Sequence, residues 1–331
     1  MKKATALILA LLMMMSSLVG CGKKNDAANA DKTDKLKVVT TIFPEYDWVK
    51  EILGDKAGDA EITMLLDKGG DLHSYQPTAD DIDKIADCDL FIYVGGESDD
   101  WVKDALENST NKDMKVINLL DVLKDSIKTE ETKPGMQAEE EHEDGKNDEH
   151  EEKEYDEHVW LSLKNVKPLV EKISEDLQEL DPENKEIYAS NTKAYVKKLS
   201  DLDDKYRETV DTAKRKTVLF GDRFPFRYLT DAYGLNYYAA FAGCSAETEA
   251  SFKTVSFLAK KMDELKLPCV LTIEGSKHKI AETIVKNTAE KNQKVRTMDS
   301  MQSTTSKDAD KGATYLSIME KNLSVLKKAL N

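Results

Sequence analysis

The chain has 331 residues and a formal net charge of −15, and 34% of its residues are charged against 40% that are hydrophobic. This length is enough for two domains, because single hydrophobic cores rarely grow beyond roughly 250–300 residues. The negative charge argues against nucleic acid as a partner, because phosphate binding requires a basic surface, and it is compatible with cations as ligands. The acidity is concentrated in residues 139–157, which hold twelve Asp and Glu against two Lys.

The N-terminus has the features of a targeting segment. Two lysines precede an apolar run that is too short for a transmembrane helix, which predicts a signal peptide over residues 1–20. The run ends in LVGC (18–21), which resembles the lipobox of bacterial lipoproteins and makes Cys21 the predicted lipidation site. A signal peptide with a chance cysteine is the alternative. Two or more acyl chains would anchor the protein stably at the extracytoplasmic face of the cell membrane, with the polar residues 21–35 as a tether.

From residue 36 onward, strands and helices are predicted to alternate. Such alternation is typical of a parallel sheet covered by helices on both faces. The predicted strands are 37–42, 60–66, 89–96 and 115–120, and the predicted helices between them are 44–53, 78–86 and 99–107.

An acidic segment at about 126–157 interrupts this pattern. It has few apolar residues and high charge, which predicts that it has no stable structure without a ligand. A helix is predicted next, from about 159 to 180. A longer helix follows over 183–213, because this stretch has no Gly or Pro and repeats apolar side chains at helical intervals. About 30 residues of helix would span about 45 Å, which predicts a rigid connector between two halves.

The second half repeats the strand and helix pattern of the first. Strands are predicted at 217–221, 235–241 and 269–275, and a last helix at 314–330. The predicted fold class is therefore α/β, with two lobes that each contain a mostly parallel sheet flanked by helices, joined by one long rigid helix. The predicted divisions are 36–182 for the N-terminal lobe with its acidic loop, 183–213 for the connecting helix, and 214–331 for the C-terminal lobe.

Three cysteines remain after Cys21. They are odd in number and have no CxxC spacing, so they form neither a convincing disulfide framework nor a zinc-finger pattern. Cys88 and Cys269 adjoin apolar strands and are predicted to be buried thiols. The third is Cys244.

Two of the five histidines lie at junctions between a loop and a helix. His73 follows the second predicted strand, at the end of a parallel sheet where α/β proteins bind ligands. His158 follows the acidic segment, directly after Asp156 and Glu157. Either histidine alone would be read as solvated or structural. Together they predict a shared metal site, because a metal-bound imidazole commonly donates its other N–H to a carboxylate.

Longer stretches carry a resemblance to a known family. The chain resembles the substrate-binding lipoproteins of bacterial zinc and manganese ABC importers over residues 36–331. The stretches that carry it are TTIFPEYDWVKEILGDKA (40–57), DLHSYQPTADDIDKIADCDLFIYVG (71–95), DEHVWLSLKN (156–165) and ELDPENKEIYASNTKAY (179–195). The resemblance implies a monomeric, lipid-anchored protein that binds a divalent cation between two α/β lobes and delivers it to an ABC permease.

The resemblance also implies four metal ligands. His73 and His158 match the first two. The third is normally a histidine in zinc proteins or a glutamate in manganese proteins, directly after a strand of the second lobe. Asp222 occupies this place here, with an ion pair to the neighbouring arginine as the alternative. Glu274 matches the fourth, a carboxylate after a later strand, and His278 is a possible substitute or addition.

The acidic segment bears on which metal is bound. Two imidazoles and two carboxylates suit Zn²⁺ and also harder ions such as Mn²⁺. Zinc proteins of this family carry a loop rich in histidine and acidic residues at this place, whereas manganese members generally lack it, so the resemblance favours Zn²⁺ with Mn²⁺ as the alternative. His142 and His150 are predicted to be weaker, mobile ligands in this loop; a solvated acidic insertion without metal is the alternative.

Two other classes of function are alternatives to transport. A zinc hydrolase with Asp222 or Glu274 as its base is disfavoured, because the sequence has no HExxH motif and no nucleophile elbow. We therefore expect a protein that is not an enzyme. An adhesin is a further possibility for a surface lipoprotein of this kind. Because imidazole must be neutral to bind metal, we expect affinity to fall as the pH drops through about 6.5.

Overall fold

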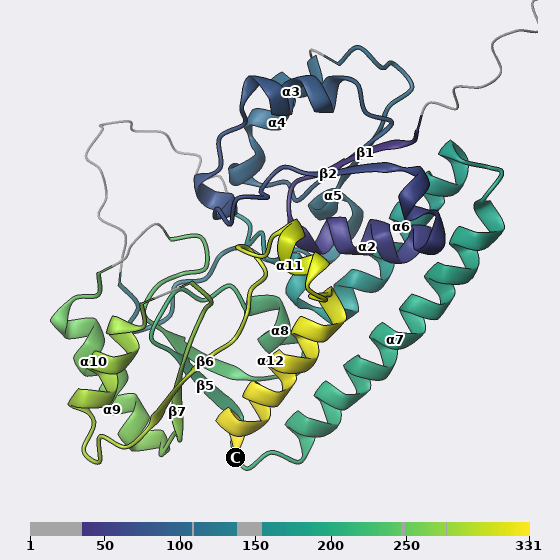
Figure 1. Cartoon of the computed structure of the whole chain (residues 1–331). Coiled ribbons are helices and arrows are strands. Elements are labelled where there is room, and N and C mark those ends of the chain that lie inside the picture. Colours follow the sequence, from purple (N-terminus) through teal and green to yellow (C-terminus); the bar gives the residue numbers. More distant parts are fainter. Residues whose placement is uncertain (1–34, 108, 138–153, 246–248, 276) are drawn as a thin grey trace, which may run out of the picture. The chain divides into compact units, whose positions relative to one another are not determined.

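The computed structural model describes residues 35–331 except 108, 138–153, 246–248 and 276. The predicted signal peptide, Cys21 and nearly all of the tether lie outside the described residues. Residues 36–331 form one compact unit, which is described here (Figure 1). Among the described residues, no helix has both the length and the apolar character needed to cross a membrane.

The first lobe contains a parallel sheet of four strands in the order β2-β1-β3-β4. The side chains of β1 and β3 are almost all buried, which is the pattern expected when helices cover both faces of a sheet. The strands are β1 (Lys37–Thr40), β2 (Glu61–Met64), β3 (Leu90–Tyr93) and β4 (Lys115–Asn118), and the helices are α2 (Phe43–Leu53), α3 (Ala79–Ala86), α4 (Trp101–Glu107) and α5 (Leu119–Leu123). Short 3-10 turns lie at η1 (Gly54–Asp59), η2 (Leu72–Ser74), η3 (Glu97–Asp99) and η4 (Lys124–Ser126).

The second lobe repeats this arrangement with the order β6-β5-β7-β8, again all parallel. Three of its strands match the prediction, whereas β8 was not predicted. Its four residues, KVRT, are half-buried or exposed at the edge of the sheet, so they lack the apolar run of a central strand. The elements are β5 (Thr217–Phe220), β6 (Asn236–Ala239), β7 (Cys269–Thr272), β8 (Lys294–Thr297), α8 (Arg227–Ala232), α9 (Phe252–Leu265), α10 (Lys279–Asn287) and α11 (Ser306–Asp310).

Two long helices lead from the first lobe to the second. The turn η5 (Val159–Leu161) precedes α6 (Leu163–Leu180), and α7 (Lys185–Asp211) continues to β5. α7 packs against α6 and α2 of the first lobe and against the last helix, α12 (Tyr315–Leu330). Figure 1 shows α7 running alongside both lobes. The predicted fold, two α/β lobes joined by one long helix, is therefore confirmed.

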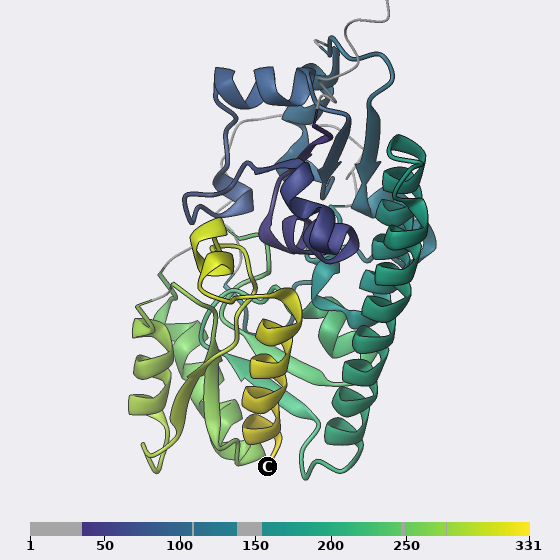
Figure 2. The same ribbon diagram turned by 45° about the vertical axis from the view of Figure 1, so that its right-hand side comes forward.

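The last helix links the lobes a second time. α12 packs against β5 and β7 of the second lobe and reaches α2 of the first (Figure 2). At its N-terminus, the Tyr315 backbone N–H donates to the buried Asp47 Oδ2 on α2 at 2.8 Å. The Tyr315 hydroxyl donates to the Trp160 carbonyl at 2.7 Å. Because these bonds are buried, they fix the two lobes to each other near the site described below.

The acidic segment is held at both of its ends. Glu130 N–H donates to the Glu154 carbonyl at 2.9 Å, and Asp156 N–H donates to the Lys128 carbonyl at 2.8 Å. Gln137 N–H donates to the Ala240 carbonyl beyond β6 at 2.8 Å, which attaches the segment to the second lobe. The prediction that all of 126–157 lacks structure is therefore wrong at its ends, because pairing and docking satisfy their backbone groups. Its middle, including His142 and His150, lies outside the described residues.

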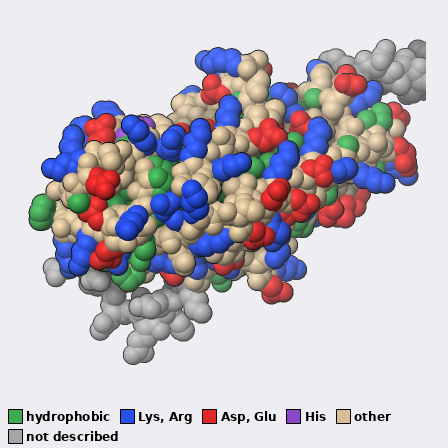
Figure 3. Space-filling model, turned by 90° about the horizontal axis from the view of Figure 1, so that it is seen from below, with side chains coloured by type: hydrophobic (Ala, Val, Ile, Leu, Met, Phe, Trp, Pro, Cys, Tyr) green, Lys and Arg blue, Asp and Glu red, His purple; other side chains and the backbone are tan. Residues whose placement is uncertain are grey.

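The exposed charge is of both signs. On the face shown in Figure 3, Lys and Arg side chains lie among Asp and Glu side chains. Despite the formal charge of −15, the described residues do not form one continuous acidic surface on this side. This agrees with the concentration of acidic residues in the segment 139–157.

Candidate metal centre

His73 is placed at the carboxyl end of the first sheet by the turn η2, directly after β2. The turn is fixed by Asp71, whose Oδ1 accepts from His73 N–H at 3.1 Å. The imidazole Nδ1 lies 2.8 Å from Ser98 Oγ and 3.3 Å from Glu157 Oε2. The Nε2 atom is thereby directed away from these groups and towards His158.

Glu157 supports His73 as a carboxylate. Its Oε1 accepts from Ser98 N–H at 2.9 Å. Burial alone would raise the pKa of Glu157, but the hydrogen bonds from His73 and Ser98 outweigh burial and hold the pKa below its usual value. An ionised carboxylate can only accept a hydrogen bond, so its position beside Nδ1 favours the tautomer of His73 that carries its proton there. The lone pair of His73 is then on Nε2.

His158 is completely buried at the start of η5. Asp156 Oδ1 lies 3.0 Å from both the backbone N–H and Nδ1 of His158. As for His73, the carboxylate oxygen at Nδ1 fixes the proton there and leaves the lone pair on Nε2. The ring packs against Trp160, with 5.3 Å between ring centroids. The Trp160 indole N–H in turn donates to the Ser300 carbonyl at 2.8 Å.

The two imidazoles converge. The Nε2 atoms of His73 and His158 lie 3.2 Å apart. Two lone pairs at this separation repel each other unless a proton or a cation lies between them. A tetrahedral zinc ion with Zn–N bonds of about 2.0–2.1 Å would place two such nitrogens about 3.3 Å apart. The geometry therefore fits two ligands of one ion, and the two histidines singled out in the sequence are brought together.

A third donor lies beside them. The described residues contain one group of three or more His, Cys, Asp and Glu whose ligand atoms all lie within 4.8 Å of one another, and its members are His73, His158 and Cys244. Cys244 follows β6 in the second lobe and is half-buried. Burial and then the carboxylates of Glu130 and Asp156 raise the pKa of its thiol.

The sequence reading missed Cys244. Its one sequence signal is its place after a strand of a parallel sheet, which it shares with His73, and the spacing of the cysteines does not point to a metal site. Cys88 and Cys269 are buried and free, as predicted. Burial raises the pKa of Cys88 to about 12 and that of Cys269 to about 11. Neither belongs to the group at His73.

Gly243 allows the Cys244 loop to reach the centre. A Cβ atom at this position would lie 2.9 Å from the Phe224 carbonyl oxygen, and 3.2 and 3.3 Å from Cε1 and Nδ1 of His158. These separations are tighter than ordinary contacts. The absence of a side chain therefore lets the backbone next to Cys244 pack closely against Cε1 and Nδ1 of His158.

Asp222 lies at the end of β5, but it is not in the group of His73, His158 and Cys244. Its Oδ1 accepts from Arg223 N–H at 3.0 Å and its Oδ2 accepts from Ile273 N–H at 3.3 Å. The Arg223 guanidinium forms its ion pair with Asp71 across the lobes. Burial alone would raise the pKa of Asp71, but Arg223 holds it below its usual value.

Glu274 also lies outside this group. After β7, its carboxylate accepts from Ser300 N–H and Ser300 Oγ, each at 2.6 Å, and from Gln302 N–H at 3.2 Å. Burial and then the nearby Asp299 carboxylate raise the pKa of Glu274 to about 6. The Gln302 amide Nε2 lies 2.9 Å from His158 Nε2. Glu274 thus contacts the centre through Gln302, another residue that the sequence reading did not identify.

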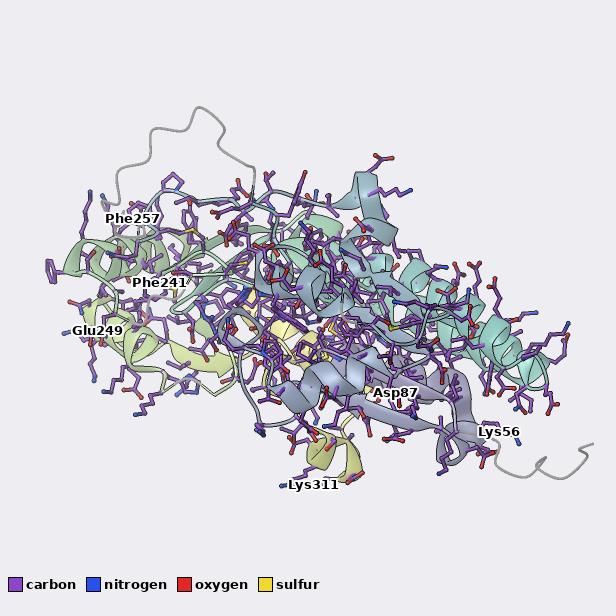
Figure 4. All side chains as sticks on the ribbon, turned by 90° about the horizontal axis from the view of Figure 1, so that it is seen from above. Lys56, Asp87, Phe241, Glu249, Phe257 and Lys311 are labelled. Carbon is purple, nitrogen blue, oxygen red and sulfur yellow. The ribbon has the colours of Figure 1, made fainter. Side chains whose placement is uncertain are left out.

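A cavity of about 870 Å³ opens beside these residues. Side chains of both lobes line it, including His73, Asp222, Glu274 and His278. Phe241 and Glu249 also line it, and Figure 4 shows both in the second lobe, far from Lys56 and Asp87 of the first. The cavity therefore connects solvent to His73 between the lobes.

Comparison with known proteins decides the family. The sequence model of the family described as "Zinc-uptake complex component A periplasmic", ZnuA, matches residues 38–329. The chain belongs to the ZnuA family. The resemblance read from the motifs is confirmed.

Members of the ZnuA family resemble the chain along most of its length. It is 32% identical to the high-affinity zinc uptake system protein ZnuA of Bacillus subtilis over 318 residues, which are 95% of this chain and 93% of the relative. It is 32% identical to the zinc-binding lipoprotein AdcA of Streptococcus pneumoniae over 330 residues, 99% of this chain but 61% of AdcA. The chain thus spans less than two thirds of that relative.

A solved ZnuA-like structure supports the fold. The Zn(II)-bound ZnuA-like domain of Streptococcus pneumoniae AdcA has a TM-score of 0.67 with this chain at 30% identity, over 89% of this chain and 99% of that one. Family membership and this likeness agree with the two-lobe architecture. The ligands assigned to individual residues of this chain remain predictions.

Proposed function

We propose that this protein captures Zn²⁺ in the cleft between its lobes and delivers it to the permease of an ABC importer. The observation that carries the proposal is the convergence of His73 and His158 Nε2 atoms at 3.2 Å, each ring supported by a carboxylate at Nδ1. Capture and release of an ion require no catalytic residue, so the protein is not an enzyme in this proposal. The zinc-binding relatives and the zinc-bound ZnuA-like domain support Zn²⁺ as the cargo.

Direct binding of the ion by the predicted oxygen ligands, Asp222 and Glu274, would break hydrogen bonds that they already make. The carboxylates of Asp222 and Glu274 both accept hydrogen bonds from backbone N–H groups. To bind the ion directly, each would have to exchange some of these hydrogen bonds for the metal. Glu274 holds the backbone N–H of Gln302, whose side-chain amide nitrogen lies 2.9 Å from His158 Nε2. Because this amide nitrogen is a hydrogen-bond donor, it must turn away before His158 Nε2 can bind the ion.

A competitive Zn²⁺ and Mn²⁺ titration of the full chain tests the proposal. We expect tight, zinc-preferring binding that falls at least a hundredfold in His73→Ala. Cys88→Ser is the control, because its buried thiol lies beside Met114 and outside the group at His73. Deletion of residues 138–153 is expected to change the affinity little. Unchanged zinc affinity in His73→Ala would refute the assignment of the metal site to His73. A preference of the wild type for Mn²⁺ would show that Mn²⁺, and not Zn²⁺, is the transported ion.

Delivery and anchoring require separate measurements. In cells that lack their zinc-binding protein, the wild-type chain is expected to restore zinc uptake under chelation and His73→Ala is not. Lipid attachment at Cys21 would hold the protein at the extracytoplasmic face of the membrane. Cys21→Ser is therefore expected to move it from the membrane fraction to the soluble fraction without changing its zinc affinity. Equal membrane association of Cys21→Ser would contradict the lipid anchor.

A further inference from the structure

Cys244 lies where a second-lobe ligand is needed. The ligands contributed by His73 and His158 both precede the connecting helix α7, whereas Cys244 follows it. A site that closes between lobes requires at least one donor from each. The ligand atoms of all three residues already lie within 4.8 Å of one another. Asp222, the second-lobe residue expected from the family pattern, is outside this group.

The Cys244 loop is held in place from several sides. Cys244 N–H donates to Glu130 Oε1 at 2.9 Å. The residue directly before Cys244, Gly243, packs against the ring of His158. On its other side, the Arg223 guanidinium donates to the Ser245 carbonyl at 3.4 Å. The sulfur is therefore positioned by the surrounding structure, as a ligand must be if it is to bind without a large ordering cost.

We propose that the Cys244 thiolate is the third ligand of the bound ion and supplies the second-lobe donor that family members provide with a different residue type. This inference rests on the proposed zinc-binding function and specifies its ligand set. On binding, the thiol releases its proton to solvent and the sulfur forms a bond to Zn²⁺. The pair of imidazoles and one thiolate then leaves a further coordination position open to another donor.

A sulfur ligand determines which ions the site retains. Thiolates favour Zn²⁺ and other borderline or soft ions, whereas Mn²⁺ prefers carboxylate, carbonyl and water oxygens. The sequence-level ligand set of two imidazoles and two carboxylates left Zn²⁺ and Mn²⁺ open. With Cys244 as a ligand, we expect discrimination against Mn²⁺. Cys244→Asp, which exchanges the sulfur for a hard oxygen, is expected to reduce the preference for Zn²⁺ over Mn²⁺.

Co²⁺ substitution of the full chain tests the assignment directly. A thiolate bound to Co²⁺ produces an intense sulfur-to-metal charge-transfer band in the near ultraviolet, which imidazole and carboxylate ligands do not produce. We expect this band in the wild type and in the control Cys88→Ser, whose thiol lies beside Met114 instead of the centre. We expect no band in Cys244→Ser, together with at least a tenfold loss of zinc affinity. Retention of the band and of wild-type affinity in Cys244→Ser would overturn the assignment.

A second measurement needs no variant and so does not depend on its folding. Zn²⁺ is expected to slow alkylation of Cys244 in the wild type at least tenfold, as read by mass spectrometry, and equal rates with and without Zn²⁺ would refute the proposal. The outcomes separate the two claims. If His73→Ala loses zinc while Cys244→Ser keeps the band and the affinity, the zinc-binding function stands and the sulfur ligand fails. If the wild type does not bind zinc, the function itself fails.

Discussion

Asp47→Asn is expected to stabilise the protein, and more so at high pH. Asp47 is a buried carboxyl on α2 that accepts the Tyr315 N–H at the start of α12. Burial is the main cause that raises its pKa from 3.8 to about 7, against the opposing effect of the Tyr315 hydrogen bond. An asparagine can accept the same hydrogen bond without a charge that must be buried.

The size of the effect follows from the two pKa values. Because the folded state holds the proton of Asp47 more tightly than the unfolded state, its ionisation destabilises the fold as the pH rises from 3.8 towards 7. The cost is about 2 kcal/mol at pH 5 and about 4 kcal/mol at pH 8 if the unfolded pKa is taken as 3.8. The positive end of the α12 dipole lowers this cost, so these values are upper bounds.

Urea unfolding of the wild type and Asp47→Asn at pH 5 and pH 8 measures the difference. We expect the stability advantage of the variant to grow between these two pH values by up to about 2 kcal/mol. Other titrating groups are common to both proteins and cancel in the comparison. A difference independent of pH, or a variant less stable than the wild type at pH 8, would refute the reasoning and show that α12 stabilises the charge.

The remaining predictions concern the centre and its support. Gly243→Ala is expected to lower zinc affinity at least tenfold, because its Cβ would press on His158, whereas Gly58→Ala meets nothing within 4 Å and serves as the control in the same titration. Equal zinc affinities of Gly243→Ala and the wild type would mean that the loop at Gly243 moves to accommodate the Cβ atom without displacing the His158 ring. Trp160→Phe is expected to lower the free energy of unfolding by about 1–3 kcal/mol in urea titration, because it leaves the buried Ser300 carbonyl without its indole partner. A loss below about 0.5 kcal/mol would contradict this.

Much of the fold was predictable because its signals are local. The central strands are apolar runs separated by helical patterns, and the uninterrupted helical spacing after Pro182 predicted α7 to within two residues at each end. β8 was missed because an edge strand of half-exposed residues lacks an apolar run. The ordered ends of the acidic segment were missed because their docking on the second lobe is a tertiary contact between distant residues.

Some residues of the candidate metal centre could likewise be predicted from local sequence signals, and others could not. His73 and His158 could be singled out because each has a carboxylate close in sequence and lies at a loop-to-helix junction. Cys244 has no such neighbour pattern, and its relation to His158 arises only when β6 and the turn η5 are brought together in space. Gln302 is likewise placed by its own hydrogen bond to Glu274. Residues that approach the centre only through the three-dimensional fold therefore cannot be found from their spacing in the sequence.

The double link made by α7 and α12 restricts how a loaded molecule can differ from an empty one. Both helices contact each lobe, and the α12 contact to Asp47 is buried. The radius of gyration should therefore change little on loading, since the lobes have no free hinge about which to swing apart. In the proposed function, a permease would then distinguish the loaded form by the ion and its ligands at the mouth of the cavity, and not by a change in the distance between the lobes.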